Sequence, residues 1–270
     1  MPAVSTTTTT DVFDTAFFRA HTARKPIEIT DHRGERRVYT FPTFFAHSRT
    51  TLVLTTARTD RASALLGDLG PLRPVRMGRG RCLAVLACFR YGELSDGMKG
   101  YHEMALGIAV SRSRLPILPA LLRRRWGSFG FWLLDLPVSS DENRVRGVEI
   151  WGYPKTMKRF RDEDGPGGRT FEMTTPEGVP CMRLVVPRTG KVRRTSEINR
   201  SYSRKDGTIL RTVTHSEGEC REAKGGRIEL EFGKVAPYDR FGELDLSTRP
   251  LVVRDFDDLS NVLYWPEPVR

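Results

Sequence analysis

The segment Gly147-Val-Glu-Ile-Trp-Gly-Tyr-Pro-Lys155 lies near the middle of the chain and contains clear signals for where a helix ends. In the charged segment before it, Ser139 and Glu142 have the spacing S-x-x-E, which is typical of a helix N-terminal capping box. Gly152 can end the helix in a left-handed turn, and Pro154 prevents its continuation. We therefore predict a helix that ends in a rigid corner just before Lys155.

The side chains around Lys155 are bulky, since Trp151, Tyr153 and Met157 lie close to it in the sequence. An ordinary lysine with a pKa of about 10.4 is neutral in only about one molecule in two thousand at pH 7. To attack a carbonyl group, its pKa must fall by roughly three to four units, which corresponds to about 4–5 kcal/mol. Loss of hydration or a neighbouring cation can lower it. The residue next to Lys155 is Thr156, which carries no charge. We therefore predict that loss of hydration makes the largest contribution to the lowered pKa, with Lys158 or Arg58 as candidate neighbouring cations.

Two further segments accompany the lysine corner in a fixed order along the chain: Arg58-Thr-Asp60 and Tyr101-His-Glu103. Together with Glu149 and Tyr153-Pro154-Lys155, they resemble the acetoacetate decarboxylase family over roughly residues 45–265. In that family the lysine at this position forms a Schiff base with the substrate ketone. The resemblance implies a metal-free and cofactor-free site, a β-barrel with a few peripheral helices, and assembly into homo-oligomers.

The resemblance also implies roles for individual residues. The expected catalytic residues are Lys155, Glu103 and Glu149, and the expected substrate-binding residues are Arg58, Tyr101 and Tyr153. Arg58 would hold the substrate carboxylate with its planar guanidinium, and Glu103 would transfer protons.

Each of these residues also has a purely structural interpretation. Arg58 could form a surface salt bridge with Asp60, and Glu103 could pair with one of the 44 basic residues. Lys155 could be a structural lysine paired with Glu149, which could otherwise orient the lysine or lie on a helix face. Tyr153 could pack without contacting substrate.

Three positions depart from the family pattern. Val148 stands where the family has an arginine, Thr156 stands where it has a second lysine, and the position near Ala87 lacks the second acidic residue of the family pocket. These departures favour a substrate other than acetoacetate, including a larger or secondary-metabolic one.

Strand signals dominate the rest of the chain. Cys82–Phe89 is an almost continuous apolar run, typical of a strand buried on both faces. In Tyr101–Ser111, Glu103 shares a face with small residues while the opposite face is apolar core. Asp206-Gly207 predicts a two-residue hairpin. Many strands and few helices predict a mainly β (α+β) fold, a closed and strongly curved antiparallel β-barrel.

Smaller elements and domain limits follow from the same signals. We predict that residues 1–24 form a flexible tail and lead-in and that residues 25–270 form a single barrel domain. Asp60 is expected to cap a short helix, Arg61–Leu66, and Leu115–Trp126 is expected to form a helix interrupted by a proline.

Composition excludes several classes of protein. The 270 residues carry a formal net charge of +11, but the basic runs are scattered and lack the interleaved aromatic residues that stack on bases. We therefore expect no nucleic-acid partner. The apolar segments are too short to span a bilayer, and the N-terminus has no signal-peptide pattern. The four cysteines indicate buried thiols in a reducing cytoplasm. Zinc, calcium and dinucleotide motifs are absent.

These observations predict a cytoplasmic lyase that acts on a small keto acid through a Schiff base on Lys155, with the iminium as electron sink for decarboxylation. One alternative is a pyruvate-type aldolase-dehydratase that uses the same lysine. An alternative of another class is a barrel that binds a small ligand without catalysis.

Overall fold

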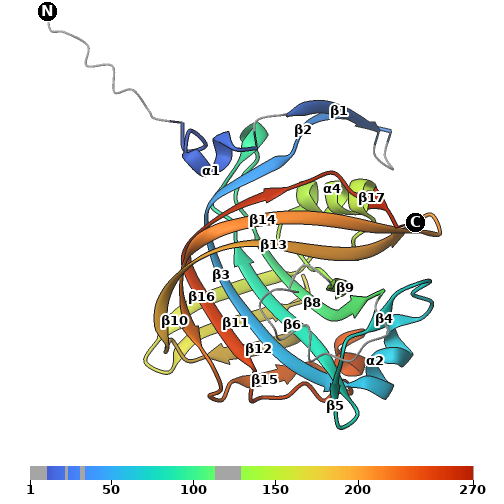
Figure 1. The fold of residues 1–270 in the computed structure, drawn as a ribbon, viewed down its shortest axis with the longest axis vertical. Coiled ribbons are helices and arrows are strands. Elements are labelled where there is room, and N and C mark those ends of the chain that lie inside the picture. The colour runs from blue at the N-terminus through green and yellow to red at the C-terminus, as the bar shows by residue number, and fades with distance from the viewer. Residues whose placement is uncertain (1–10, 22–23, 31–33, 113–128, 270) are drawn as a thin grey trace, which may run out of the picture.

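The computed structural model describes residues 11–21, 24–30, 34–112 and 129–269, and its central feature is a closed seven-stranded β-barrel (Figure 1). The barrel strands are β3 (Thr43–Arg58), β6 (Arg81–Arg90), β8 (His102–Ser111), β9 (Gly130–Asp135), β13 (Lys191–Lys205), β14 (Thr208–Ala223) and β16 (Val252–Leu263). Each strand pairs with the next in the order β3-β6-β8-β9-β13-β14-β16, and β16 pairs with β3 to close the ring. The predicted closed barrel is confirmed.

One pair of strands differs from the predicted antiparallel arrangement. β9 and β13 run parallel where Phe131 lies opposite Ser201. Between these two strands the chain forms a helix and three strands of a second sheet. Such a long crossover allows the chain to re-enter the barrel in the same direction, which a short hairpin cannot do.

A second, four-stranded sheet packs against the outside of the barrel. It contains β10 (Arg159–Gly165), β11 (Gly168–Thr174), β12 (Pro180–Val186) and β15 (Glu229–Phe232). Its Met173 and Leu184 belong to the same buried cluster as Leu86, Met104 and Leu106 of the barrel. Two neighbouring barrel strands, β6 and β8, are therefore covered on their outer face as well as on their inner face.

This double cover explains the composition of β8. Met104 and Leu106 point to the second sheet, whereas Glu103 and Ala105 line the interior of the barrel. Successive side chains in a strand point to opposite faces, so the predicted division of this strand into a core face and a small-residue face is confirmed. The predicted burial of Cys82–Phe89 on both faces is confirmed in β6 for the same reason.

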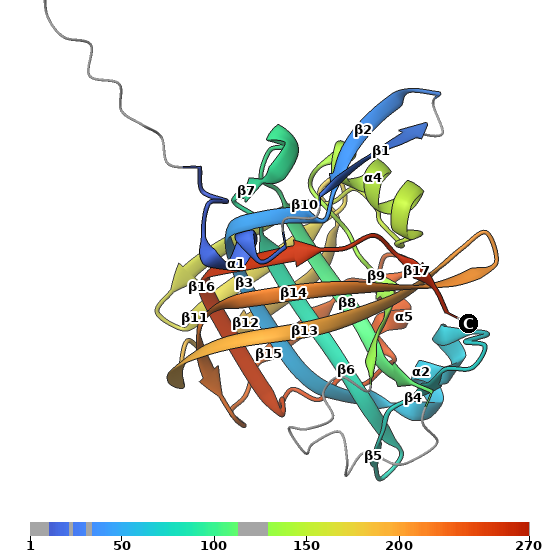
Figure 2. The same cartoon turned by 45° about the horizontal axis from the view of Figure 1, so that its top comes forward.

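The described helices are short and peripheral: α1 (Ala16–Arg19), α2 (Thr59–Leu66), the single 3-10 turn η1 (Ser95–Gly97), α4 (Asp141–Trp151) and α5 (Tyr238–Gly242). The remaining strands are short or form the hairpin β1–β2: β1 (Lys25–Thr30), β2 (Arg36–Phe41), β4 (Arg73–Pro74), β5 (Arg76–Gly78), β7 (Glu93–Leu94) and β17 (Glu267–Pro268). The β1–β2 hairpin projects from the end of the molecule where α1 and α4 lie (Figures 1 and 2).

Two predicted helix starts are wrong by one or two residues. Ser140, not Ser139, caps α4, and its Oγ accepts a hydrogen bond from the Asn143 N–H. Ser139 instead accepts a hydrogen bond from the His102 N–H, which ties the start of the helix to β8. Helix α2 begins at Thr59, so Asp60 lies within its first turn and does not cap it.

Part of the predicted N-terminal lead-in is packed on the barrel. Phe18 is 1% exposed and contacts Phe44, with a distance of 5.0 Å between the ring centroids. Residues 1–10 and the predicted helix over residues 115–126 lie outside the described residues. The hairpin at Asp206-Gly207 is confirmed, because both residues have positive φ and Lys205 pairs with Thr208.

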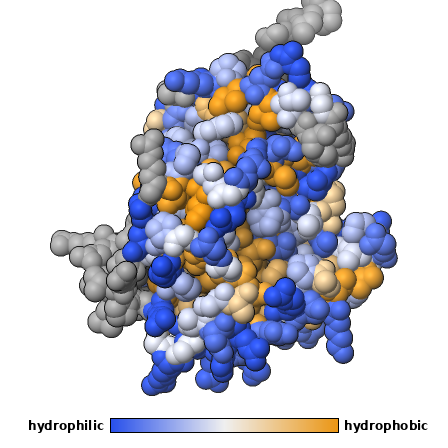
Figure 3. All heavy atoms as spheres, turned by 90° about the vertical axis from the view of Figure 1, so that its right-hand side faces the viewer, coloured by the Kyte–Doolittle hydropathy of each residue, from blue (hydrophilic) through white to orange (hydrophobic). Residues whose placement is uncertain are grey.

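The hydropathy of the surface and the burial of the cysteines both bear on the expectations from the sequence. In the view of Figure 3, hydrophilic side chains surround a narrower strip of hydrophobic ones. All four cysteines are buried and unpaired, as expected from the sequence. In the part of the chain that the structure describes, no helix is long and apolar enough to cross a membrane.

Candidate active site

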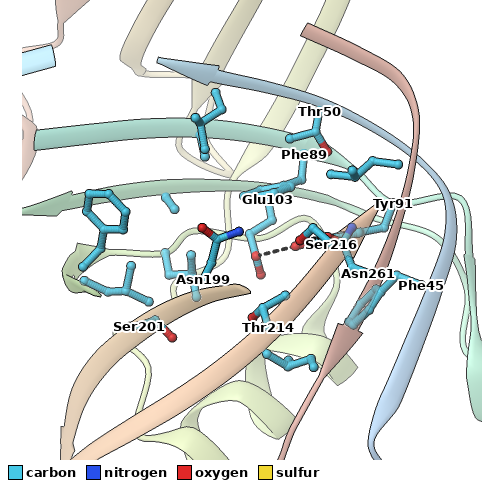
Figure 4. A pocket seen from close by; sticks show the side chains of 18 of the residues that line it. Phe45, Thr50, Phe89, Tyr91, Glu103, Asn199, Ser201, Thr214, Ser216 and Asn261 are labelled. Atoms are coloured by element: carbon cyan, nitrogen blue, oxygen red, sulfur yellow. Dashed lines mark hydrogen bonds between the residues drawn. The ribbon is translucent and has the colours of Figure 1, made fainter. Parts of the chain in front are cut away.

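The interior of the barrel holds a cavity of about 190 Å³. Side chains from all seven barrel strands, from α4 and from the segment after α4 line it. One wall is mainly apolar and aromatic and includes Phe45, Ala87, Phe89 and Ala105. The small side chains of Ala87 and Ala105 leave space beside Glu103, which projects from β8 into the cavity (Figure 4).

The corner after α4 directs Lys155 into this cavity. Gly152 adopts the left-handed conformation at φ 60°, and its N–H bonds to the carbonyl groups of Gly147 and Val148, as the sequence predicts. The chain then turns through Tyr153 and Pro154. The Lys155 side chain is 6% exposed, while Thr156 on the opposite side is exposed.

Gly147 makes room for the lysine stem. A Cβ atom at this position would lie 2.3 Å from Lys155 Cδ and 2.5 Å from Lys155 Cε. The lysine therefore lies directly against the helix backbone, and no larger residue at position 147 is compatible with this path. This contact joins Gly147 and Lys155, which are eight positions apart in the sequence.

The carboxylate of Glu103 meets the lysine inside the barrel. Lys155 Nζ lies 2.5 Å from Glu103 Oε2. Tyr91 donates a hydrogen bond to Glu103 Oε1 at 3.1 Å, and Tyr101 lies 3.5 Å from Oε2. Burial raises the pKa of both tyrosines well above the usual value, and the charge of Glu103 adds to this effect. Both hydroxyl groups are therefore protonated at neutral pH and can donate hydrogen bonds.

Burial lowers the pKa of Lys155 below its ordinary value of 10.5. The charge of Glu103 and its hydrogen bond oppose this shift, and the positive charge of Arg146 reinforces it. Burial is the largest contribution, as predicted from the sequence. The neighbouring cation is Arg146, whereas the candidates had been Lys158 and Arg58.

Arg146 is the residue of this site that the sequence did not indicate. It is 3% exposed, and its guanidinium lies over the rings of Tyr39, Phe41 and Trp151 at 4.7, 5.3 and 5.2 Å. Burial lowers its pKa below the usual value. The available signal was its place on α4, where it falls on the same buried face as Asn143 and Ile150.

The guanidinium of Arg146 is only partly satisfied. It donates to Thr43 Oγ1 and to Met98 Sδ, while its buried Nε has no hydrogen-bond partner. Among the described residues, no carboxylate lies within ion-pair distance of it. A buried cation that lines a cavity and has no carboxylate at ion-pair distance favours an anionic ligand.

The structure brings four of the six predicted site residues together: Lys155, Glu103, Tyr101 and Tyr153 all line the cavity. The ring of Tyr101 lies 5.5 Å from Lys155 Nζ, and the Tyr153 hydroxyl lies 2.8 Å from Ser201 Oγ. Burial raises the pKa of Tyr153 to about 12, so its hydroxyl is also protonated at neutral pH.

Arg58 and Glu149 lie elsewhere. Arg58 is exposed at the far end of β3 and bonds to Asp60 through Nε at 3.1 Å and Nη2 at 2.9 Å, which is the structural alternative considered for it. Glu149 is half-buried on α4 and does not line the cavity, and its carbonyl oxygen accepts a hydrogen bond from Lys205. The inward positions of α4 are those of Asn143, Arg146 and Trp151.

The sequence profile of the family described as acetoacetate decarboxylase (ADC) matches residues 26–248. The chain belongs to the acetoacetate decarboxylase family. No curated protein sequence matches it with comparable significance. Within the described residues, no group of three or more histidine, cysteine or acidic side chains could hold a metal ion.

Several solved structures share the fold of this chain at low sequence identity. An acetoacetate decarboxylase from Legionella pneumophila is 12% identical, with a TM-score of 0.59 over 85% of this chain and 87% of that one. An acetoacetate decarboxylase-like enzyme from Sphingomonas wittichii is 16% identical, with a TM-score of 0.54 over 85% and 93%. The enduracididine biosynthesis enzyme MppR, complexed with pyruvate, is 14% identical, with a TM-score of 0.57 over 84% and 90%.

The contact between Gly147 and Lys155 predicts the effect of Gly147→Ala. The added methyl group displaces the lysine stem and separates Nζ from Glu103, whereas the helix itself gains up to about 1 kcal/mol of stability from the alanine. The pH dependence of acylation of Lys155, read by peptide mass, should therefore change, and because the methyl group also crowds a buried site, the melting temperature should not rise. Gly167→Ala, with open space around position 167, is the control. An unchanged profile would show that the lysine does not follow this path.

The opposing effects of burial and Glu103 predict a shift in Glu103→Gln. Since the carboxylate raises the pKa of Lys155, its removal should lower that pKa further. The acylation profile of Lys155 should then move to lower pH, and more of the amine should be neutral at pH 7. A shift to higher pH would mean that the carboxylate does not stabilise the charged lysine.

Proposed function

We propose that this protein is a Schiff-base-forming lyase that acts on a small keto acid. The observation that supports this proposal best is the buried amine of Lys155, 2.5 Å from the carboxylate of Glu103 inside the cavity of the barrel. A lysine with a lowered pKa is a nucleophile, and an adjacent carboxylate accepts and returns its protons. Membership of the acetoacetate decarboxylase family also supports the proposal.

The proposed reaction begins with attack of the neutral Nζ on the substrate ketone. The amine becomes neutral when Glu103 takes a proton from the lysine ammonium, and Glu103 returns this proton to the alkoxide that the attack creates. Glu103 then takes a second proton from the nitrogen and passes it to the hydroxyl group of the carbinolamine, which leaves as water and gives an iminium. For a β-keto acid, the electron pair of the bond to the carboxylate moves into the iminium, CO2 leaves, and an enamine forms. Protonation of the enamine carbon and hydrolysis of the imine release the ketone and the lysine.

Arg146 is proposed to bind the substrate carboxylate. Its buried Nε has no partner in the described part of the chain, and its guanidinium lines the same cavity as Lys155. A guanidinium matches the geometry of a carboxylate. This role replaces the one expected for Arg58, which is exposed and bonded to Asp60.

The second candidate function is condensation of a pyruvate-like donor with an aldehyde, followed by dehydration. The arginine favours this possibility, because a guanidinium that holds a carboxylate stabilises its charge, whereas decarboxylation requires that charge to leave. An α-keto acid keeps its carboxylate, and its iminium loses a proton to form the enamine that attacks the aldehyde. MppR, which shares the fold, has a structure with the condensation product of pyruvate and imidazole 4-carboxaldehyde.

Borohydride trapping tests the Schiff base. Incubation with acetoacetate or pyruvate and borohydride should add one substrate-sized mass to the wild-type protein, located at Lys155 by peptide mapping, and none to Lys155→Met. Lys158→Met is the matched control, because Lys158 lies over the ring of Tyr238 and does not line the cavity. No adduct with either acid would leave a non-catalytic binding barrel. Release of CO2 or formation of a condensation product then separates the two reactions.

Substitution of Arg146 should weaken carboxylate binding, whereas substitution of Arg58 should not. In Arg146→Gln, the half-saturating concentration of keto acid in the trapping assay should rise by at least about tenfold, since a charged hydrogen bond contributes about 1.5–3 kcal/mol. Trapping of acetone, which has no carboxylate, should be affected much less. Arg58→Gln should behave as the wild type. A loss in Arg58→Gln with no effect in Arg146→Gln would restore the role expected from the sequence.

A further inference from the structure

The wall of the cavity formed by β13, β14 and β16 carries a group of polar side chains beside Phe256, Leu259 and Leu263, unlike the wall that carries Ala87 and Phe89. The strand register places its inward side chains in neighbouring rows. Asn199 of β13 pairs with Thr214 of β14. Ser216 of β14 pairs with Asn261 of β16. These four side chains line the cavity and are labelled in Figure 4, where they come from the strands that face β8 across the cavity.

Hydrogen-bonding capacity in this wall is left unused. Ser216 donates to Asn261 Oδ1 at 2.7 Å, but the Asn261 Nδ2 group is buried without a partner in the described part of the chain. Asn261 is 5% exposed. Thr50, on the neighbouring strand β3, is 2% exposed, and its Oγ1 is unpartnered in the same way. A buried polar group without a partner is costly, so two of them in one cavity favour a polar ligand.

The charges on the inner face of this wall are paired. Arg254 bonds to Glu197 at 2.5 Å and to Glu222 at 2.9 Å, so Glu197 and Arg254, which both line the cavity, neutralise each other. Arg200 of β13 also borders the cavity, but it alternates with Asn199 and Ser201, so its side chain points to the opposite face of the strand. The cavity therefore has a cationic end at Lys155 and Arg146 and a neutral hydrogen-bonding wall. Among the described residues, a second carboxylate would find no unpaired cation on the inner face of that wall, whereas a hydroxyl or amide group would find both donors and acceptors.

We infer that Asn261, Ser216, Thr214 and Asn199 form a second subsite, which binds a neutral hydroxyl or amide group of the substrate, remote from the ketone. This inference rests on the proposed function, because it takes the ketone and the carboxylate to be held at Lys155 and Arg146. The substrate is then longer than acetoacetate and carries an uncharged polar group at its far end, or the subsite binds the polar group of an aldehyde that condenses with the enamine.

Two acids that differ by a single hydroxyl group test the subsite: phenylpyruvate and 4-hydroxyphenylpyruvate. Their dissociation constants are measured by calorimetry, and their adducts with Lys155 by borohydride trapping. The wild type should bind 4-hydroxyphenylpyruvate about tenfold more tightly, the difference expected for one or two neutral hydrogen bonds. In Asn261→Leu and in Thr214→Val, which remove hydrogen-bonding groups at nearly constant volume, this ratio should fall towards one. The pyruvate adduct reports that the variants are folded.

Ser196→Ala is the matched control, because Ser196 is an exposed residue of β13 that does not line the cavity, and it should keep the ratio of the wild type. Equal binding of the two acids by the wild type would overturn the inference. So would a ratio that survives in both variants, or binding of pyruvate with no binding of either aromatic acid. Absence of any covalent adduct, with the binding preference intact, would instead overturn the proposed lyase function and leave the subsite standing.

Discussion

The contact between the amine of Lys155 and the carboxylate of Glu103, both kept from water, is the interaction on which the site depends. A carboxylate so close to a lysine stabilises its charged form, so the contact alone would give an inert ion pair. Burial of the side chain and the nearby charge of Arg146 act in the opposite direction, and the pKa of Lys155 is lowered overall. The lysine can therefore be a nucleophile only because the barrel encloses it.

The fold supplies that enclosure from both sides. The second sheet packs on the outer face of β6 and β8, while the inner residues of these strands line the cavity. Helix α4 then closes the lysine side, where Gly147 lets the stem of Lys155 lie against the helix backbone. The aromatic side chains of the β1–β2 hairpin and of α4 surround Arg146, so the same shell that excludes water also holds the cation.

Local signals in the sequence were sufficient for the lysine corner and the strand that faces it. Gly152 and Pro154 define how α4 ends, and the alternation in β8 places Glu103 on the cavity face, so both could be predicted from neighbouring residues alone. Arg146 could not be identified in this way. Its importance comes from contacts with Tyr39, Phe41 and Met98, which are distant in the sequence, and an arginine on a helix is ordinarily a surface residue.

Arg58 is the opposite case, because the sequence assigned it to the site and the structure places it outside the cavity. Arg58 lies at the end of β3, but a strand has two ends and the sequence does not say which lies near the cavity. The parallel pairing of β9 with β13 and the unpartnered amide of Asn261 likewise depend on how distant strands meet. The register that creates the polar wall is a property of the closed barrel and is invisible in any single strand.

The most direct test of this account is the pKa of Lys155 in the wild-type protein. A pH titration of the lysine side-chain resonances by NMR, with Lys155 assigned by its loss in Lys155→Arg and Lys158 as internal reference, measures it without a substrate. The account predicts a midpoint for Lys155 below the ordinary value of 10.5. A midpoint at or above 10.5 would show that the ion pair with Glu103 prevails over burial, and the lysine would then be structural.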